Sequence, residues 1–272
     1  RSRNLAVKAY PIFSNSDSTD INGSLIVIRD VTKESEALRQ QGEFVAHVAH
    51  ELKTPLNTLA LYAEALIDDT DDDPQSRVEA ANIMQDEVER LAGLIDNLLN
   101  ITRIEMGEIS IDRQQVRLAD FLEDTFEVAS RMDKAGDLKF KLDLSPGLGS
   151  IMADKDLLRI AINNLLTNAV KYSRPGGVVH MSCEETEQMI RIVVRDDGIG
   201  IAEEDQERIF ERFFRSEDSE ARSRTGHGLG LPLARDIVQL HYGALTVLSK
   251  LNEGSEFVIQ IWKETGMLKQ AV

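Results

Sequence analysis

The sequence predicts an α+β protein of several domains, in which a helical segment precedes a mixed α/β domain. The chain has 272 residues, more than one typical domain needs. Two long stretches with few helix breakers carry apolar residues at alternating steps of three and four. From about Ile109 onward, short apolar runs typical of strands alternate with helical stretches.

Composition excludes several classes of protein. The net charge is 31 − 47 = −16, and so acidic a chain repels phosphate backbones, which excludes nucleic acid as a general partner. Cys183 is the only cysteine, so no internal disulfide can form. The apolar runs fall far short of the ~20 residues that span a bilayer. We expect a soluble, cytoplasmic chain, with any membrane attachment coming from a region that precedes Arg1.

The first 31 residues predict two strands, at Leu5–Phe13 and Ser24–Arg29, separated by a turn-rich gap. A lone hairpin is only marginally stable in water. We therefore expect residues 1–31 to be the final strands of a domain.

Residues 32–106 predict a helical hairpin. The first helix runs from Thr32 to about Asp68, and a second follows after Pro74. One hairpin cannot enclose both apolar stripes well, so the simplest expectation is a homodimer that forms an antiparallel four-helix bundle. The stripes comprise Val45, Val48, Leu52, Leu56, Leu59, Ala63 and Leu66, and then Ala81, Met84, Val88, Leu91, Ile95, Leu98 and Thr102.

The acidic loop between these helices has a second interpretation. Asp69, Asp71 and Asp73 have the alternate spacing of a calcium loop. However, Pro74 stands where the sharp-turn glycine is needed, and Ala80 where the bidentate glutamate is needed. A solvated loop is the better interpretation.

Residues 109–265 predict an α/β sandwich domain, and residues 266–272 a tail. The expected strands are Leu138–Leu144, Val178–Cys183, Met189–Arg195, Ala244–Leu248 and Glu256–Trp262. The expected helices are Leu118–Lys134, Asp154–Val170, Glu203–Phe210 and Leu229–His241.

One candidate catalytic group lies in the first long helix. At ~100° per residue, His50 points away from the buried stripe. Glu51 can polarise its imidazole, and Thr54 lies one turn further on the same side. Pro55 inside a helix costs ~3 kcal/mol, a cost that a functional kink would offset. His47 is the competitor, but no acid follows it.

Three further segments have ligand-binding character. Asn164, Asn168 and Lys171 share one helix face, where amide oxygens suit Mg²⁺ and a lysine suits phosphate. Asp196 ends a strand and precedes a Gly-x-Gly turn, which allows close approach of a flat ligand. Glycines 226, 228 and 230 open a helix as an anion cradle. The polar stretch between these segments, from Ser216 to Arg224, suits a mobile lid.

The string His-Glu-Leu-Lys-Thr-Pro-Leu at 50–56 resembles the phospho-acceptor box of bacterial sensor histidine kinases. The other segments, in their order, resemble the asparagine, glycine and phenylalanine boxes of the ATP-binding domain of these kinases, a Bergerat-type sandwich. The resemblance covers about Leu38–Lys263. It implies that His50 accepts a phosphoryl group from ATP, that Glu51 is its general base and that Thr54 positions water for dephosphorylation of a response regulator.

The resemblance also implies the nucleotide site. Asp196 would bind the adenine amino group and Asn168 would hold Mg²⁺. His227 departs from the small hydroxyl residue more usual there. The implied ATP-binding residues are Asn164, Asn168, Lys171, Tyr172, Asp196, Gly198, Gly200, Ile201, Phe210, Arg215, Gly226, His227, Gly228, Leu229, Gly230 and Leu231.

Two matters stay open at the level of the sequence. Residues 1–31 resemble the end of a PAS sensor domain, and Asp30-Val31-Thr32 resembles the junction of such a domain with a signalling helix. An unrelated β-hairpin would have the same sequence pattern. The rival function is a conformational ATPase on the same sandwich, which would lack the His50 box. A binding-only scaffold is disfavoured because every expected catalytic position is filled. The partners implied are a second copy of the chain and the receiver domain of a response regulator.

Overall fold

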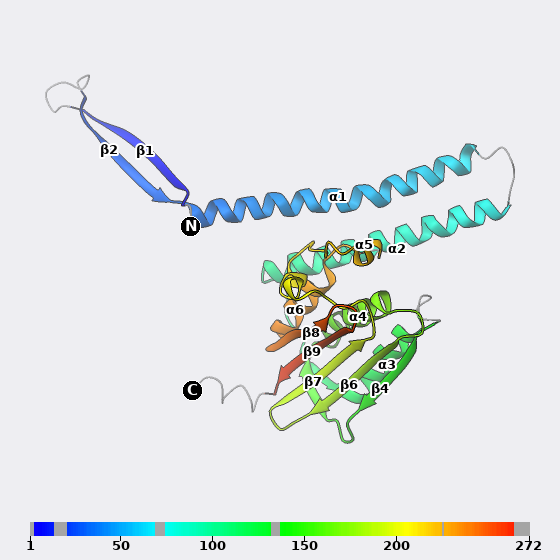
Figure 1. Cartoon of the computed structure of the whole chain (residues 1–272). Helices are drawn as coiled ribbons and strands as arrows, with labels where there is room; N and C mark the ends of the chain where they lie inside the picture. The colour runs from blue at the N-terminus through cyan, green and yellow to red at the C-terminus, as the bar shows by residue number, and fades with distance from the viewer. Residues whose placement is uncertain (1–2, 14–20, 69–73, 132–136, 225, 264–272) are drawn as a thin grey trace. The chain divides into compact units, whose positions relative to one another are not determined.

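The computed structural model describes residues 3–13, 21–68, 74–131, 137–224 and 226–263 (Figure 1). The chain divides into two compact units, Arg1–Val88 and Glu89–Val272, and each is considered by itself. Within the described ranges, no helix is both long enough and apolar enough to span a bilayer.

The first unit begins with the predicted pair of strands. β1 (Leu5–Phe13) and β2 (Ile21–Asp30) pair antiparallel, with Val7 opposite Ile28. Apolar side chains on the ribbon are exposed, including Val7 and Ile28. The ribbon is tied to the helix that follows, because the Thr32 backbone N–H donates to Asp30 Oδ1 at 3.0 Å and the Thr32 hydroxyl donates to the same oxygen.

Two long helices come next, as predicted. α1 spans Thr32–Asp68 and α2 spans Pro74–Glu105, and the acidic loop with its calcium alternative lies outside the described residues. α2 ends because Gly107 adopts φ +66°, which lets the Glu108 N–H bond back to the Arg103 carbonyl. In this single chain, members of both predicted stripes remain exposed, among them Val45, Leu56 and Val88.

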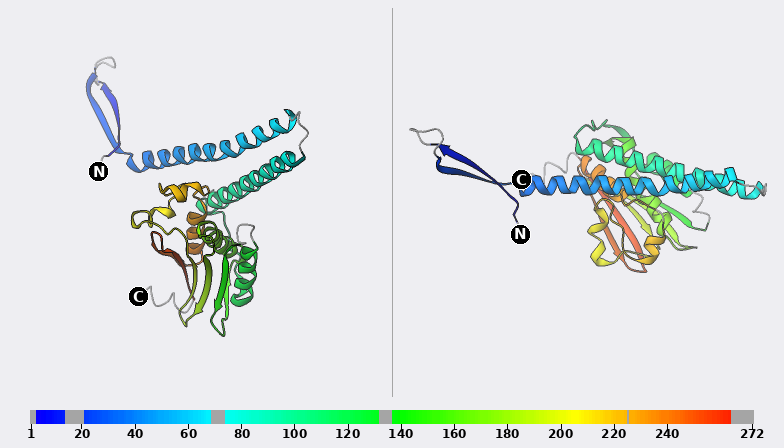
Figure 2. Two further views of the ribbon diagram at one scale, coloured as in Figure 1. Left: turned by 45° about the vertical axis from the view of Figure 1, so that its right-hand side comes forward. Right: turned by 90° about the horizontal axis from the view of Figure 1, so that it is seen from above.

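The second unit is built on a five-stranded mixed sheet in the order β4-β6-β7-β9-β8. β4 and β6 are parallel, and the other neighbours are antiparallel. Three helices cover one face of this sheet and form the two-layer core with it (Figure 2). The strands are β4 (Lys139–Leu144), β6 (Val178–Glu185), β7 (Met189–Asp196), β8 (Gly243–Lys250) and β9 (Gly254–Trp262), and the helices are α3 (Leu118–Ser130), α4 (Lys155–Tyr172) and α6 (Gly230–Leu240).

Some local predictions need correction. The expected helix Glu203–Phe210 is instead two 3₁₀ turns, η2 (Glu203–Asp205) and η3 (Arg208–Phe210). Between them the Gln206 amide donates to the Ser249 carbonyl at 2.8 Å, and this bond ties the turn to β8. Two short strands, β3 (Gln114–Arg117) and β5 (Ser150–Ala153), were not predicted and pair with each other in a separate sheet.

A buried histidine joins the two helices that flank the site. Asp154 caps α4 by accepting from the backbone N–H groups of Asp156 and Leu157 at 3.1 and 3.0 Å. His241, at the end of α6, accepts from the Asp154 N–H through Nε2 at 3.1 Å and donates through Nδ1 to the Ile237 carbonyl at 2.8 Å. Burial lowers the pKa of His241, which keeps it in this neutral form.

Candidate functional site

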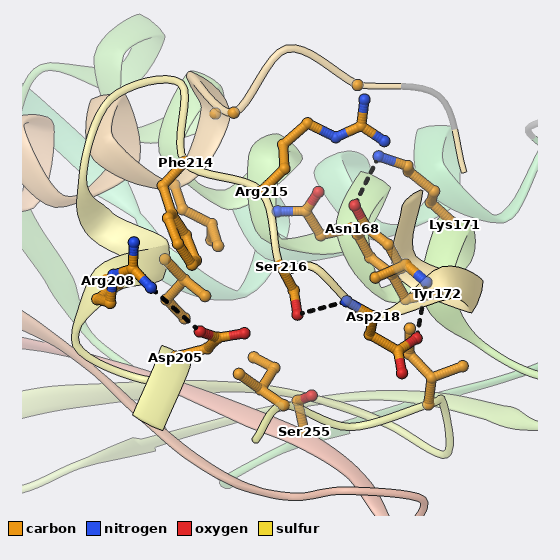
Figure 3. Close-up of a pocket in the computed structure, with 18 of the residues that line it drawn as sticks. Asn168, Lys171, Tyr172, Asp205, Arg208, Phe214, Arg215, Ser216, Asp218 and Ser255 are labelled. Carbon is orange, nitrogen blue, oxygen red and sulfur yellow. Dashed lines mark hydrogen bonds and ion pairs between the residues drawn. The ribbon is translucent and has the colours of Figure 1, made fainter. Parts of the chain in front are cut away.

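A cavity of about 600 Å³ in the second unit collects most of the predicted nucleotide residues (Figure 3). Its walls come from α4, the segment after β7, the lid region and the start of α6. The predicted residues that line it are Asn164, Asn168, Lys171, Tyr172, Asp196, Gly200, Ile201, Arg215, Gly226, His227, Gly228, Leu229, Gly230 and Leu231.

A buried carboxylate marks the apolar part of the cavity. Asp196 ends β7 and is 4% exposed. Burial raises the pKa of this carboxyl group to about 6, against the lowering effect of the hydrogen bonds it accepts from the backbone of Gly198 and Ser255. Ile199 and Phe257 are apolar residues that line the same cavity. A carboxylate among flat apolar walls can accept a hydrogen bond from an amino group on an aromatic ring.

Glycines allow the backbone to close around Asp196. Gly198 does not line the cavity, but its N–H donates to Asp196 Oδ1 at 2.9 Å, and a Cβ there would lie 2.5 Å from that same oxygen. Gly254, at the start of β9, has φ +91°, and a Cβ there would lie 2.0 Å from the Asp196 carbonyl oxygen. Both positions therefore require glycine, and at Gly198 a Cβ would also lie 2.4 Å from the Tyr172 carbonyl oxygen.

The amide face of α4 forms another wall of the cavity. The Asn164 side chain donates to the Ile160 carbonyl at 3.0 Å, which leaves Oδ1 directed at the start of α6, where a Cβ on Gly230 would lie 2.5 Å from it. Lys171 Nζ donates to the Tyr172 hydroxyl at 2.8 Å. Burial raises the pKa of Tyr172, so its hydroxyl stays protonated.

The glycine segment approaches these groups closely. Gly228 has φ +67°, and a Cβ there would lie 2.7 Å from the Phe214 carbonyl oxygen. A Cβ on Gly226 would lie 2.4 Å from Lys171 Nζ. Backbone amides at the N-terminus of α6, with a lysine beside them, form a cradle for an anion.

The predicted lid contains a short helix, α5 (Ser219–Ser223), capped by Asp218. Arg215 donates to the Arg224 carbonyl at 2.7 Å, and Arg224 donates to the Lys171 carbonyl at 2.9 Å. In Figure 3 the basic groups of Arg215 and Lys171 appear at one end of the cavity, and Asp205, Arg208 and Ser255 at the other. The cavity therefore has the basic groups of Arg215 and Lys171 at one end, and its lining also includes two buried carboxylates, Asp196 and Asp205.

Two findings differ from the sequence interpretation. Phe210 lies outside the lining, because it is buried beneath Arg235, whose guanidinium lies 5.1 Å from the ring centroid. Further lining residues were not among the predicted ligand residues, although some of them lie within the predicted segments and the predicted lid. They are Asn97, Thr167, Ile199, Ala202, Glu204, Asp205, Arg208, Ile209, Phe214, Ser216, Glu217, Asp218, Ala221, Pro232, Leu251, Ser255 and Phe257.

The other candidate site belongs to the first unit. His50 and Thr54 are exposed on α1, and Glu51 between them is half-buried. The Thr54 hydroxyl donates to the His50 carbonyl at 3.4 Å. Pro55 inside α1 lacks the N–H that would bond to the Glu51 carbonyl. An exposed imidazole beside a carboxylate can act as a nucleophile toward a group presented from outside the helix.

The residues present fit a magnesium ion that arrives with a nucleotide. Asn168 lines the cavity, and its amide offers a hard oxygen ligand. Mg²⁺ is ordinarily held by one or two protein oxygens together with substrate phosphates.

Comparison with known families identifies both regions. Residues 40–107 match the model of the His Kinase A (phospho-acceptor) domain, and residues 153–265 match that of the histidine kinase-, DNA gyrase B- and HSP90-like ATPases. The chain is 30% identical over 243 residues to the sensor protein SrrB of Staphylococcus aureus, which is 89% of this chain and 41% of SrrB. The chain thus spans about two fifths of the length of this curated relative.

Solved structures agree on the fold. Full-length ShkA, crystallised with AMPPNP, is 26% identical with a TM-score of 0.61, over 81% of this chain and 46% of that one. ThkA, crystallised with the response regulator protein TrrA, has a TM-score of 0.65 at 22% identity, over 94% of this chain and 74% of that one. The histidine kinase AdeS of Acinetobacter baumannii has a TM-score of 0.63 at 23% identity, over 79% of this chain and 98% of that one.

Proposed function

Because the chain belongs to the sensor histidine kinases of bacterial two-component systems, we propose that it transfers the γ-phosphoryl group of ATP to His50. The observation that carries the proposal is the cavity of the second unit, which joins a buried carboxylate and apolar walls to a basic, glycine-rich end. That combination of groups suits a nucleotide, because a carboxylate with apolar side chains can bind an adenine ring, and a lysine with glycine amides can bind a polyphosphate.

The chemistry follows from the residues. Asp196 accepts a hydrogen bond from the adenine amino group, and Asn164, Lys171, Tyr172 and the glycine-segment amides hold the phosphates. The imidazole of His50 attacks the γ-phosphorus in line, the bond from that phosphorus to the bridging oxygen breaks, and Glu51 takes the imidazole proton. Asn168 would hold Mg²⁺, which would supply charge neutralisation at the phosphates.

The phosphoryl group then passes to an aspartate of a separate response regulator, and Thr54 positions water for the reverse, phosphatase, reaction. The ThkA structure, a similar fold crystallised with a response regulator protein, supports a partner of this kind. We also propose the domain division made from the sequence, with residues 1–31 as the end of a PAS-like sensor domain, 32–106 as the phosphotransfer hairpin, 109–265 as the ATP-binding domain and 266–272 as a tail.

The decisive experiment is incubation with γ-labelled ATP followed by acid and by alkali. We expect label on the protein that is lost in acid and kept in alkali, which is the signature of a phosphoramidate. A conformational ATPase, the rival function, would release labelled phosphate and leave the protein unlabelled.

The exposed stripes on α1 and α2 support a homodimer, since Val45, Leu56 and Val88 are each more than half exposed in the single chain. We expect light scattering to give twice the chain mass of 30.4 kDa at micromolar concentration. A particle of 30.4 kDa under those conditions would contradict the dimer.

A further inference from the structure

The C-terminal half of α2 contacts the ATP-binding region of its own unit through one helix face. We call this the α2 docking face, and define it by Arg90, Leu94, Asn97, Ile101 and Glu105. Steps of four, three, four and four place these residues in one row, ~22 Å long at 1.5 Å per residue. Leu94 and Ile101 are fully buried, whereas Ile95 and Leu99, on other faces of α2, are exposed.

Polar contacts hold the two ends of the docking face. At one end Arg90 Nε donates to His227 Nε2 at 3.3 Å. At the other end Glu105 pairs with Arg212, which also lies 3.6 Å from Asp236 of α6. Between these ends, Asn97 lines the same cavity as Asn168 and the glycine segment.

The bond at His227 places a cation beside the anion cradle. His227 accepts the bond through Nε2. The Nε–H of the Arg90 guanidinium therefore donates to a ring nitrogen that carries no proton. His227 itself lines the cavity and stands between Gly226 and Gly228. A guanidinium bonds a phosphate oxygen more strongly than a neutral nitrogen, because the bond is charge-assisted and can be bidentate.

We propose that α2 is a wall of the nucleotide site and that Arg90 binds the polyphosphate of the nucleotide directly. On this view Arg90 exchanges its His227 partner for a phosphate oxygen when the nucleotide enters, while Asn97 contacts the nucleotide from the same helix. Binding of the nucleotide therefore strengthens the contact between the ATP-binding domain and the phosphotransfer hairpin. The inference rests on the proposed function, because it requires a nucleotide in this cavity.

The test compares the affinities of Arg90 variants for ADP and for adenosine, which lacks phosphates. We expect Arg90→Ala to weaken ADP binding by about 10-fold or more, the scale of a lost charge-assisted bond, and to leave adenosine binding unchanged. Arg90→Lys should restore part of the loss, because the point charge remains. Arg103→Ala is the matched control, since Arg103 is exposed on the opposite side of the same helix.

Hydrogen exchange gives an independent readout on the intact chain. ADP should slow exchange in residues 90–105 of wild type, and less so in Arg90→Ala, while both proteins show protection of residues 226–231. Equal affinity of wild type and Arg90→Ala for ADP, tighter binding by the variant, or faster exchange in residues 90–105 would each overturn the inference. Failure of the proposed function is a different result, namely no binding of ADP or adenosine by wild type.

Discussion

The two regions assigned to the reaction differ in how much of their chemistry the fold builds. His50 and Thr54 are exposed on one helix, and the bond from the Thr54 hydroxyl to the His50 carbonyl stays within that helix. The nucleotide cavity is assembled from segments between Asn97 and Phe257, and it raises the pKa of Asp196 to about 6. The acceptor is therefore a local feature of sequence, while the nucleotide site depends on tertiary structure. It follows that a substitution can remove one without disturbing the other.

The largest expected effect comes from removing the acceptor. His50→Ala should lower self-labelling by at least about 1,000-fold, because no other group supplies the nucleophile. ADP affinity should stay unchanged, since the cavity belongs to the other unit. Filter-bound label and calorimetric titration measure the two quantities.

His47→Ala is the control for this experiment, because His47 lies one turn away on the same helix and is also exposed. It should label at nearly the wild-type rate. Loss of label in His47→Ala, with label kept in His50→Ala, would move the nucleophile to His47.

Asn168→Ala tests whether the amide face of α4, which lines the cavity, binds a metal ion. Loss of the proposed oxygen ligand should weaken ADP binding in the presence of Mg²⁺ by about 10- to 100-fold, with little change in EDTA. Asn163→Ala is the matched control, because Asn163 is the nearby asparagine of α4 that does not line the cavity. The same affinity with and without EDTA in both wild type and Asn168→Ala would refute the metal role.

The raised pKa of Asp196 predicts that nucleotide binding depends on pH. Its ionised form accepts the adenine amino hydrogen, so affinity should be constant above about pH 6 and fall about tenfold per pH unit below the pKa of about 6. Asp196→Asn should flatten this profile and weaken binding at pH 7.5 by about tenfold. A wild-type profile that is flat from pH 5 to 8 would contradict the role.

The same carboxyl group affects the free energy of unfolding in the opposite direction: low pH weakens nucleotide binding but stabilises the folded chain. Its pKa is higher in the folded chain than the usual 3.8, so the folded state binds the proton more tightly than the unfolded state between about pH 4 and 6. Its contribution to the free energy of unfolding is therefore full below pH 4 and is lost as the pH rises to about 6. Asp196→Asn should raise the melting temperature of the nucleotide-free protein at pH 7.5.

The smallest and most selective effect is expected at Thr54. Thr54→Ala should keep self-labelling within about twofold, since the hydroxyl takes no part in the attack by His50. It should lose dephosphorylation of the phosphorylated regulator, whereas Glu51→Ala should damage labelling. Both are measured by loss or gain of label in purified components. Dephosphorylation by Thr54→Ala at the parent rate would show that the hydroxyl does not position water.

Much of the fold could be predicted because it is local. The steps of three and four predicted α1 and α2, and strand-type runs predicted the five strands of the large sheet. β3 and β5 could not be predicted, since each has four residues and each needs the other to pair. Residues 203–210 have helical composition, but the bond from Gln206 to Ser249 and the burial of Asp205 favour two tight turns.

The candidate site also has one part that could be predicted from the sequence and one part that could not. The polar half of the cavity could be read from spacing, because Asn164, Asn168 and Lys171 lie on one helix. The apolar residues Leu251 and Phe257 could not be predicted, since they reach the cavity only through the pairing of β7 with β9 and the turn between β8 and β9. The place of Asn97 in the cavity lining could not be predicted from the sequence, because it depends on the docking of α2.

The glycine at 254 has a genetic consequence. Every single-base change of a glycine codon that yields another amino acid adds a Cβ, and at this position a Cβ would lie 2.0 Å from the Asp196 carbonyl oxygen. Gly254 does not line the cavity, so a screen guided by distance from the ligand would pass over it. In a random mutant library selected for loss of signalling with normal expression, substitutions of this codon should therefore recur as often as those of the residues that line the cavity.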